Sequence, residues 1–202
     1  MHALVYAHCK GVCNVQGVCY DMHTRTIVHP NHHQQPHHYH LQDGTLLDSE
    51  SRIDPSSVNA IKAVLKKGIH VIAATGKARP AAIAVARDAG LEGYLVSRAG
   101  PGIFLQGMAV HGRDGSLLRT ARMPDEAVRA VMAWARHHRV PCCAFLGDSC
   151  VTLEMQPELR QLHELYYEPL AGVVQDVEGV LAAGDVKKVA WLRSKCSGLW
   201  SR

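Results

Sequence analysis

The chain has 202 residues, 47% of them apolar and 5% aromatic, and a formal net charge of +4 from 22 basic and 18 acidic residues. This length fits one domain or a small domain with an insert, and the apolar fraction is enough for a sizeable core. The charge is mild and spread along the chain, which argues against a nucleic-acid partner. No run of 18 apolar residues is present, so we predict no membrane-spanning helix.

Residues 1–36 are expected to be disordered. Nine of the 14 histidines lie at or before His40, and the tract from His29 to His40 is poor in apolar residues and contains two prolines. Such a segment cannot bury enough surface to offset the entropy lost on ordering. Its histidines and cysteines are suited to adventitious Zn²⁺ or Ni²⁺ binding, but nothing in it predicts the fixed geometry of a physiological metal site.

A globular pattern starts near residue 43. Asp54-Pro55 predicts the start of a helix that Gly68 ends. Further along, we predict a buried strand over Ile69 to Ala74, a helix over Ala78 to Ala89, and another strand within Leu91 to Ser97. Alternating strands and helices predict an α/β fold with a parallel sheet and crossover helices. The residues just ahead, His37 to His40, make a poor candidate for a buried strand.

The second half predicts an α+β arrangement. We expect short strands at 103–105, 108–111 and 117–121, a helix from residue 124, a hairpin of strands 142–146 and 150–154, helices near 158–165 and 177–183, and a strand at 186–192. The seven cysteines lack the spacing of a disulfide scaffold, so we predict free thiols in a reducing, intracellular compartment. Cys142, Cys143 and Cys150 are expected to be buried small hydrophobic residues.

Two loops carry the residue types that bind anions. One is Asp43-Gly44-Thr45, and the other runs from Thr75 through Gly76 and Lys77 to Arg79, after the strand that ends at Ala74. Ligands of an open α/β sheet bind at the carboxyl ends of its strands. The Thr75 hydroxyl and the following helix N-terminus suit a phosphate, and Lys77 and Arg79 add positive charge. Each loop alone is a common turn; the two in this order are more specific.

These two loops, in DGTLLDSE and ATGKARPA, resemble the first two motifs of the haloacid dehalogenase-like (HAD) superfamily, in particular its Cof-type phosphatases. The segment Gly100 to Gly107 extends the likeness to the HAD-like domain that plants and algae carry in chloroplast proteins, fused to a YbeY-type endoribonuclease. The resemblance covers Asp43 to about Val189. It implies a partial Rossmann-like, three-layer α/β/α core over 37–100, an inserted α+β cap over 101–189, and an irregular tail over 190–202. It also implies a chloroplast location.

The resemblance implies a chemistry as well. In the family, a first aspartate attacks phosphorus, and a second protonates the leaving group and then activates water. Late acidic residues hold Mg²⁺ together with the first aspartate. Asp43 matches the general acid/base, and Gly44, Thr45, Thr75, Gly76 and Lys77 match the phosphate-binding positions. Small phosphorylated metabolites are the implied substrates.

The sequence departs from that pattern at two places. Leu41 occupies the nucleophile position, and a leucine side chain cannot attack phosphorus or ligate a metal. No Asp or Glu occurs from Trp191 to Arg202, where the resemblance places part of the Mg²⁺ site, so Mg²⁺ binding is in doubt. We therefore expect a HAD-like hydrolase that is catalytically incomplete, with 1–42 and 190–202 unrelated to the family. The alternative is a non-catalytic fragment or a module that binds a ligand or partner.

Overall fold

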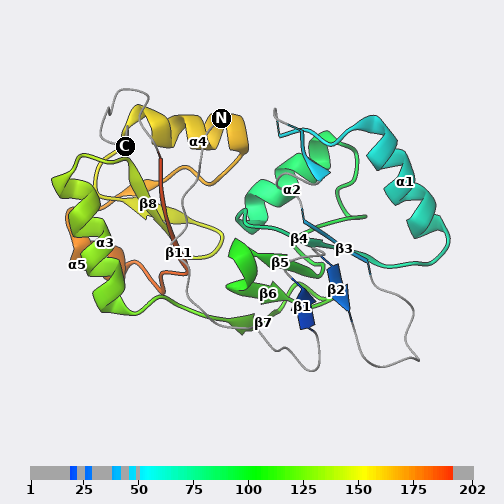
Figure 1. The fold of residues 1–202 in the computed structure, drawn as a ribbon, viewed down its shortest axis with the longest axis horizontal. Coiled ribbons are helices and arrows are strands. Elements are labelled where there is room, and N and C mark those ends of the chain that lie inside the picture. The colour runs from blue at the N-terminus through cyan, green and yellow to red at the C-terminus, as the bar shows by residue number, and fades with distance from the viewer. Residues whose placement is uncertain (1–18, 22–25, 29–37, 42–45, 49–50, 193–202) are drawn as a thin grey trace. The chain divides into compact units, whose positions relative to one another are not determined.

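The computed structural model describes residues 19–21, 26–28, 38–41, 46–48 and 51–192. The described residues divide into two compact units, one up to Thr120 and the other from Ala121 onward (Figure 1). Each unit has its own sheet, and both are mixed α/β, as the sequence predicts.

The first unit is built on a five-stranded sheet of order β3-β4-β5-β6-β7. Strands β3, β4 and β5 are parallel to one another, β6 pairs antiparallel with β5, and β7 pairs antiparallel with β6. Helices α1 and α2 connect its parallel strands (Figure 1). The strands are β3 (His38–Leu41), β4 (Val71–Ala74), β5 (Gly102–Phe104), β6 (Ala109–His111) and β7 (Leu117–Thr120); the helices are α1 (Pro55–Lys66), α2 (Arg79–Asp88) and the 3₁₀ turn η2 (Leu105–Gly107).

Helix α1 begins where the sequence predicts. Asp54 is its N-cap and accepts a hydrogen bond from the Ser56 backbone amide at 2.8 Å, while Pro55 occupies the first turn. The Ser56 hydroxyl donates to the same carboxylate at 2.5 Å. An N-cap carboxylate satisfies amides that have no partner within the helix. Gly68 follows the C-cap with φ of 76°, a backbone conformation that favours glycine.

The Asp54 carboxyl is expected to titrate below its ordinary range, because the two hydrogen bonds from Ser56 stabilise its charged form and lower its pKa. A lowered folded-state pKa means that Asp54 stabilises the fold above its unfolded pKa, and that this stabilisation is lost as pH falls through the folded value. An NMR titration of the Asp54 carboxyl carbon checks this. Replacing Ser56 with alanine should raise the Asp54 pKa, and an unchanged pKa in that variant would contradict the assignment.

Two sequence predictions for the first unit are corrected by the structure. The segment Leu91 to Ser97 is no strand of the sheet: only an isolated bridge joins Glu92 and Val96, and the third parallel strand is β5. Leu91, Leu95 and Val96 are buried as anchors of a loop instead. The residues before Asp43, expected to make a poor strand, do form β3, which lies at the edge of the sheet. An edge strand pairs on one side only, so it tolerates a polar sequence.

The segment expected to be disordered contains two short strands, β1 (Cys19–Asp21) and β2 (Thr26–Val28), which pair antiparallel. The rest of residues 1–36 lies outside the described residues, as does the tail beyond residue 192. The sequence interpretation starts the cap at residue 101, whereas the structure divides the chain between Thr120 and Ala121. The reason is that Ile103 pairs with Ala74, which adds β5, and through it β6 and β7, to the first sheet.

The second unit contains a four-stranded sheet of order β10-β9-β8-β11 and three helices. Strands β8 and β9 form the predicted hairpin, and β11 pairs antiparallel with the other edge of β8. Helix α3 starts after Pro124, as predicted, with two acidic residues in its first turn. The elements are α3 (Asp125–His137), β8 (Cys142–Phe145), β9 (Cys150–Thr152), α4 (Pro157–Tyr166), β10 (Gly172–Val173), α5 (Val177–Ala182) and β11 (Lys188–Trp191).

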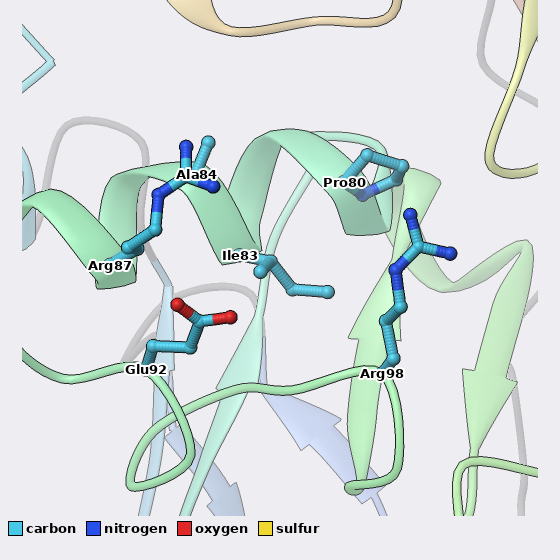
Figure 2. A pocket seen from close by; sticks show the side chains of 6 residues that line it. All are labelled: Pro80, Ile83, Ala84, Arg87, Glu92 and Arg98. Atoms are coloured by element: carbon cyan, nitrogen blue, oxygen red, sulfur yellow. The ribbon is translucent and has the colours of Figure 1, made fainter.

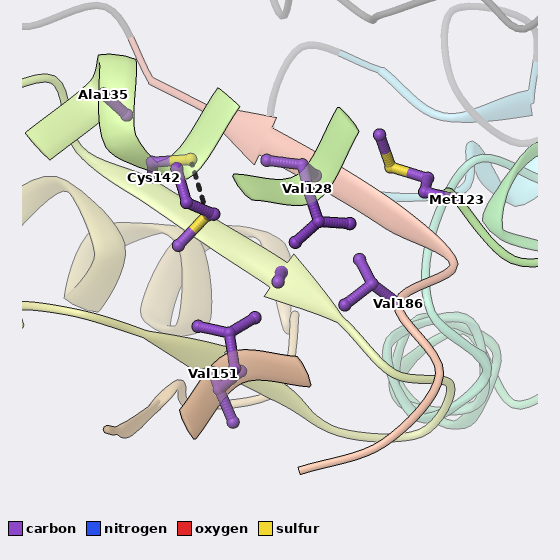
Figure 3. Close-up of a cluster of buried hydrophobic side chains, with 10 residues drawn as sticks. Met123, Val128, Ala135, Cys142, Val151 and Val186 are labelled. Atoms are coloured by element: carbon purple, nitrogen blue, oxygen red, sulfur yellow. Dashed lines mark hydrogen bonds between the residues drawn. The ribbon is translucent and has the colours of Figure 1, made fainter. Parts of the chain in front are cut away.

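The core of the second unit lies between α3, α5 and one face of the sheet (Figure 3). Val128 and Met132 of α3 are buried at helical spacing, as the sequence predicts, and face Cys142 and Ala144 of β8. The Cys142 thiol approaches the Met132 sulfur at 3.6 Å, marked by the dashed line in Figure 3. Because neighbouring strand residues point to opposite faces, this leaves Cys143 and Phe145 on the other face, where both are buried.

Buried thiols are a testable feature of this core. Burial raises the pKa of Cys142 to about 12. A hydrogen bond with Cys150, together with burial, raises the pKa of Cys143 well above its ordinary range. A thiol that stays protonated and covered is a poor nucleophile. We expect Cys142, Cys143 and Cys150 to resist iodoacetamide in the native chain at pH 8 and to react fully in denaturant. Mass spectrometry of tryptic peptides checks this, and rapid native alkylation of Cys142 would contradict it.

Candidate functional site

The two predicted loops leave the sheet at one edge. Strands β3 and β4 are parallel neighbours, and their register pairs Leu41 with Ala74, the last residue of each strand. Thr75 directly follows β4, and Asp43 follows Leu41 by two positions. Asp43, Gly44 and Thr45 themselves lie outside the described residues. The register nevertheless shows that both loops start from the carboxyl edge of adjacent parallel strands, where open α/β sheets bind ligands.

The second loop is buried and tightly hydrogen-bonded. The Thr75 amide donates to the Ile103 carbonyl at 2.8 Å, and the Thr75 hydroxyl accepts from the Lys77 amide at 3.1 Å. Thr75 is 3% exposed and Lys77 is 5% exposed. Burying an ammonium group is costly unless polar groups compensate it, so the low exposure of Lys77 is typical of a site built for charge. The loop thus presents a hydroxyl and a lysine from a fixed backbone.

Two residues that hold this loop were not identified from the sequence. The Leu105 amide donates to the Lys77 carbonyl at 3.0 Å, and the Gln106 amide donates to the Thr75 carbonyl at 3.1 Å. Leu105 and Gln106 both adopt positive φ, 50° and 60°, which is unusual for residues other than glycine. Such backbone strain persists where surrounding structure enforces it, often at functional sites. The sequence offers one signal for the role of these two residues, which is that both lie in the Gly100–Gly107 segment that resembles the family.

The positive charges of the second loop have different surroundings. Helix α2 starts after Ala78, whose side chain carries no capping group, and Pro80 lies in its first turn. Arg79, expected to add charge to the loop, directs one guanidinium nitrogen toward His111 Nδ1 at 3.1 Å and toward the Arg98 and Gly115 carbonyls at 3.5 Å. Arg79 therefore ties α2 to β6 and the turn after it. The buried Lys77 is a further candidate for binding an anion.

The lysines before and in β11 have structural surroundings of their own. Lys187 lies 3.7 Å from an Asp185 carboxylate oxygen, and the Lys188 ammonium lies over the Phe145 ring, 4.8 Å from its centroid. Both are buried in the second unit. A cation over an aromatic face is stabilised by the ring quadrupole. These contacts give the two lysines roles within their own unit.

The residues that the structure describes do not fit a magnesium ion. Among them, no three His, Cys, Asp or Glu side chains come together in a group suited to a metal. Mg²⁺ prefers several oxygen ligands in near-octahedral geometry. The HAD superfamily generally uses Mg²⁺, yet no catalytic step can be derived through a metal from these side chains. Within the same residues, no helix has both the length and the apolar character to cross a bilayer.

The parallel β3-β4-β5 sheet is an α/β fold with a candidate ligand site at its carboxyl edge, where Thr75 and Lys77 are buried. Residues 42–183 match the haloacid dehalogenase-like hydrolase family, so the chain belongs to that family. The resemblance stated from the sequence is thereby confirmed.

Two curated relatives illustrate the breadth of the family. The chain is 37% identical over 152 residues to the chloroplastic endoribonuclease YBEY of Arabidopsis thaliana, an alignment that covers 74% of this chain and 26% of that protein. It is 22% identical over 117 residues to the phosphatase YwpJ of Bacillus subtilis strain 168, covering 58% of this chain and 39% of YwpJ. The chain thus spans well under half the length of either relative.

Solved structures share the fold. BT1666 of Bacteroides thetaiotaomicron, a phosphatase of the HAD superfamily, superposes with a TM-score of 0.56 at 26% identity, covering 81% of this chain and 58% of that one. The HAD subclass IIB sugar phosphatase BT4131 superposes with a TM-score of 0.61 at 17% identity, covering 81% and 71% of the two chains. At that identity the second likeness concerns the fold alone.

Proposed function

We propose that this chain binds the phosphoryl group of small phosphorylated metabolites between its two loops and that its catalytic turnover is negligible. The observation that carries the proposal is the Leu41–Ala74 register, because it ends β3 beside the end of β4, which the buried Thr75 and Lys77 follow. A hydroxyl, a lysine and the start of a helix are groups that bind phosphate well.

The roles we propose follow the motif positions. Thr75, Gly76 and Lys77 bind the phosphoryl oxygens from one side, and Gly44 and Thr45 bind them from the other. Asp43 is the general acid/base of the family's aspartyl-phosphate mechanism. The position of the nucleophile holds Leu41, whose side chain has no lone pair to attack phosphorus. The site therefore retains groups that recognise a phosphate but lacks the group that forms the covalent intermediate.

Calorimetric titration of the full chain with inorganic phosphate tests the binding role. Replacing Lys77 with methionine keeps most of the length of the side chain and removes its charge, so we expect phosphate affinity to fall by about tenfold or more. Lys67→Met is the matched control, since Lys67 is an exposed lysine at the end of α1, and its affinity should equal that of the native chain. Equal affinity in native and Lys77→Met chains would remove the basis of the proposal.

A location in the chloroplast is part of the proposal. It is supported by the relative at 37% identity, which is described as chloroplastic. A fluorescent fusion of the full chain, offered to isolated plastids, would test it. We expect the fusion to be imported, and a fusion that stays outside would contradict the proposal.

A second candidate function is a non-catalytic module that recruits a partner. The second unit supports it, because the unit has a buried core of its own, and a domain with its own core can in principle fold alone. Pull-down with the full chain, followed by a wash with phosphate, would distinguish the two candidate functions. Phosphate should displace a ligand from the phosphoryl-binding site, whereas a protein recruited by the second unit should remain bound.

A further inference from the structure

A pocket of about 380 Å³ lies along the flank of α2, within the first unit (Figure 2). One wall is a single stripe of the helix, because Pro80, Ile83, Ala84 and Arg87 follow one another at spacings of three, one and three residues. The opposite wall is the segment that leads to β5, which contributes Glu92 and Arg98. None of the residues of the phosphoryl-binding loop lines it, so the pocket is separate from that site. Its volume is typical of sites for small molecules.

Both walls have a fixed backbone. The opposite face of α2 is buried through Ala82 and Val85, and the facing segment is anchored by the buried side chains of Leu91 and Leu95. The backbone at Arg98 is held on two sides. Its carbonyl accepts from the Arg79 guanidinium at 3.5 Å, and it packs so closely on Gly115 that a Cβ there would lie 2.2 Å from that carbonyl oxygen. The charged side chains therefore project from a preformed frame.

The charges of the pocket do not neutralise one another. Within the part of the chain that the structure describes, no carboxylate oxygen of Glu92 lies within 4.0 Å of an Arg87 or Arg98 nitrogen, and the ion pair of Arg87 is with Asp88 at 3.8 Å. Figure 2 shows Arg98 beside Pro80 at one end and Arg87 with Glu92 at the other, with Ile83 between them. One end thus offers a guanidinium, the middle is aliphatic, and the other end offers a donor and an acceptor.

We propose that this pocket binds a small organic anion with two polar ends. A carboxylate or phosphate contacts the Arg98 guanidinium, a short aliphatic segment covers Ile83 and Ala84, and a hydroxyl or amino group at the far end donates to Glu92. Guanidinium groups bind carboxylates and phosphates through charge-assisted hydrogen bonds. Glu92 favours a hydrogen-bond donor at its end of the pocket.

Methyl-resolved NMR of the full chain tests the proposal at the pocket itself. The probes are 4-hydroxybutyrate and glycerol 3-phosphate, which separate a carboxylate from a phosphate ligand, with butyrate and inorganic phosphate as one-ended analogues. We expect the Ile83 δ1-methyl signal to shift saturably with at least one two-ended probe. That probe should bind about tenfold more tightly than its one-ended analogue, and Arg98→Gln should weaken it about tenfold.

Arg136→Gln is the matched control, because Arg136 is an exposed arginine of the second unit, and its affinity should equal that of the native chain. The proposal is overturned if neither two-ended probe shifts Ile83 saturably, or if Arg98→Gln binds the probe as tightly as the native chain. Because the readout is a signal in the pocket and no activity is measured, the result is independent of phosphate binding at Thr75 and Lys77.

Discussion

The chain is expected to hydrolyse p-nitrophenyl phosphate about 10³- to 10⁶-fold more slowly than a complete phosphatase of its family. The reason is the side chain at the end of β3. We propose that Leu41 stands at the position of the attacking aspartate, and a leucine side chain cannot form an aspartyl phosphate. Electrostatic stabilisation by Lys77 and backbone amides alone supplies only part of a phosphatase's rate enhancement. The release of p-nitrophenol, followed over hours with the full chain, measures the rate.

Two variants make this expectation decisive. Asp43→Asn should leave the rate unchanged, since a general acid has no role in a reaction that does not start. Leu41→Asp places a carboxylate at the nucleophile position. If the rate rises with Leu41→Asp and falls again when Asp43→Asn is added, the other residues of the site are sufficient for hydrolysis once a nucleophile is present. Steady hydrolysis by the native chain that depends on Asp43 would show that Leu41 does not block the reaction.

The Met132→Ala substitution is expected to destabilise the second unit by about 2–5 kcal/mol. Met132 is 1% exposed and packs between α3 and β8, against the Cys142 thiol. Removing its side chain leaves a cavity that the surrounding helices and strands can only partly fill. Trp134 and Trp191 both lie in the second unit, so urea unfolding followed by tryptophan fluorescence reports on that unit.

The matched control for the core substitution is Leu165→Ala. Leu165 lies on α4 of the same unit but is 58% exposed, so its truncation should change the unfolding free energy by less than about 0.5 kcal/mol. If Met132→Ala proved no more destabilising than Leu165→Ala, the described packing of α3 against β8 would be contradicted.

Local signals made much of the fold predictable. Asp54-Pro55 and Pro124 mark the starts of α1 and α3, and the apolar spacing within α3 predicts its buried face. These signals act within a few residues, so one sequence is enough to read them. By contrast, the apolar residues of the Leu91–Ser97 segment are compatible with either a strand or a buried loop. Burial alone does not distinguish a strand from a buried loop, because contacts with distant residues determine which of the two forms.

What the sequence did not predict depends on contacts between distant residues. The extent of the first unit follows from the pairing of Ile103 with Ala74, and the strand β3 follows from its place at the sheet edge. In the candidate site, Thr75 and Lys77 stand out from the sequence, whereas the amides of Leu105 and Gln106 that hold them do not. A backbone hydrogen bond across 28 to 31 positions leaves no trace in residue type.

The central claim is that the loops after β3 and β4 form one phosphoryl-binding site. A titration of isotopically labelled full chain with inorganic phosphate, followed through the backbone amide signals of Gly44 and Gly76, tests it most directly. We predict that both signals shift along the same saturation curve, because one ligand contacts both loops. Saturation of Gly76 without any response of Gly44, or no saturable shift of either, would contradict it.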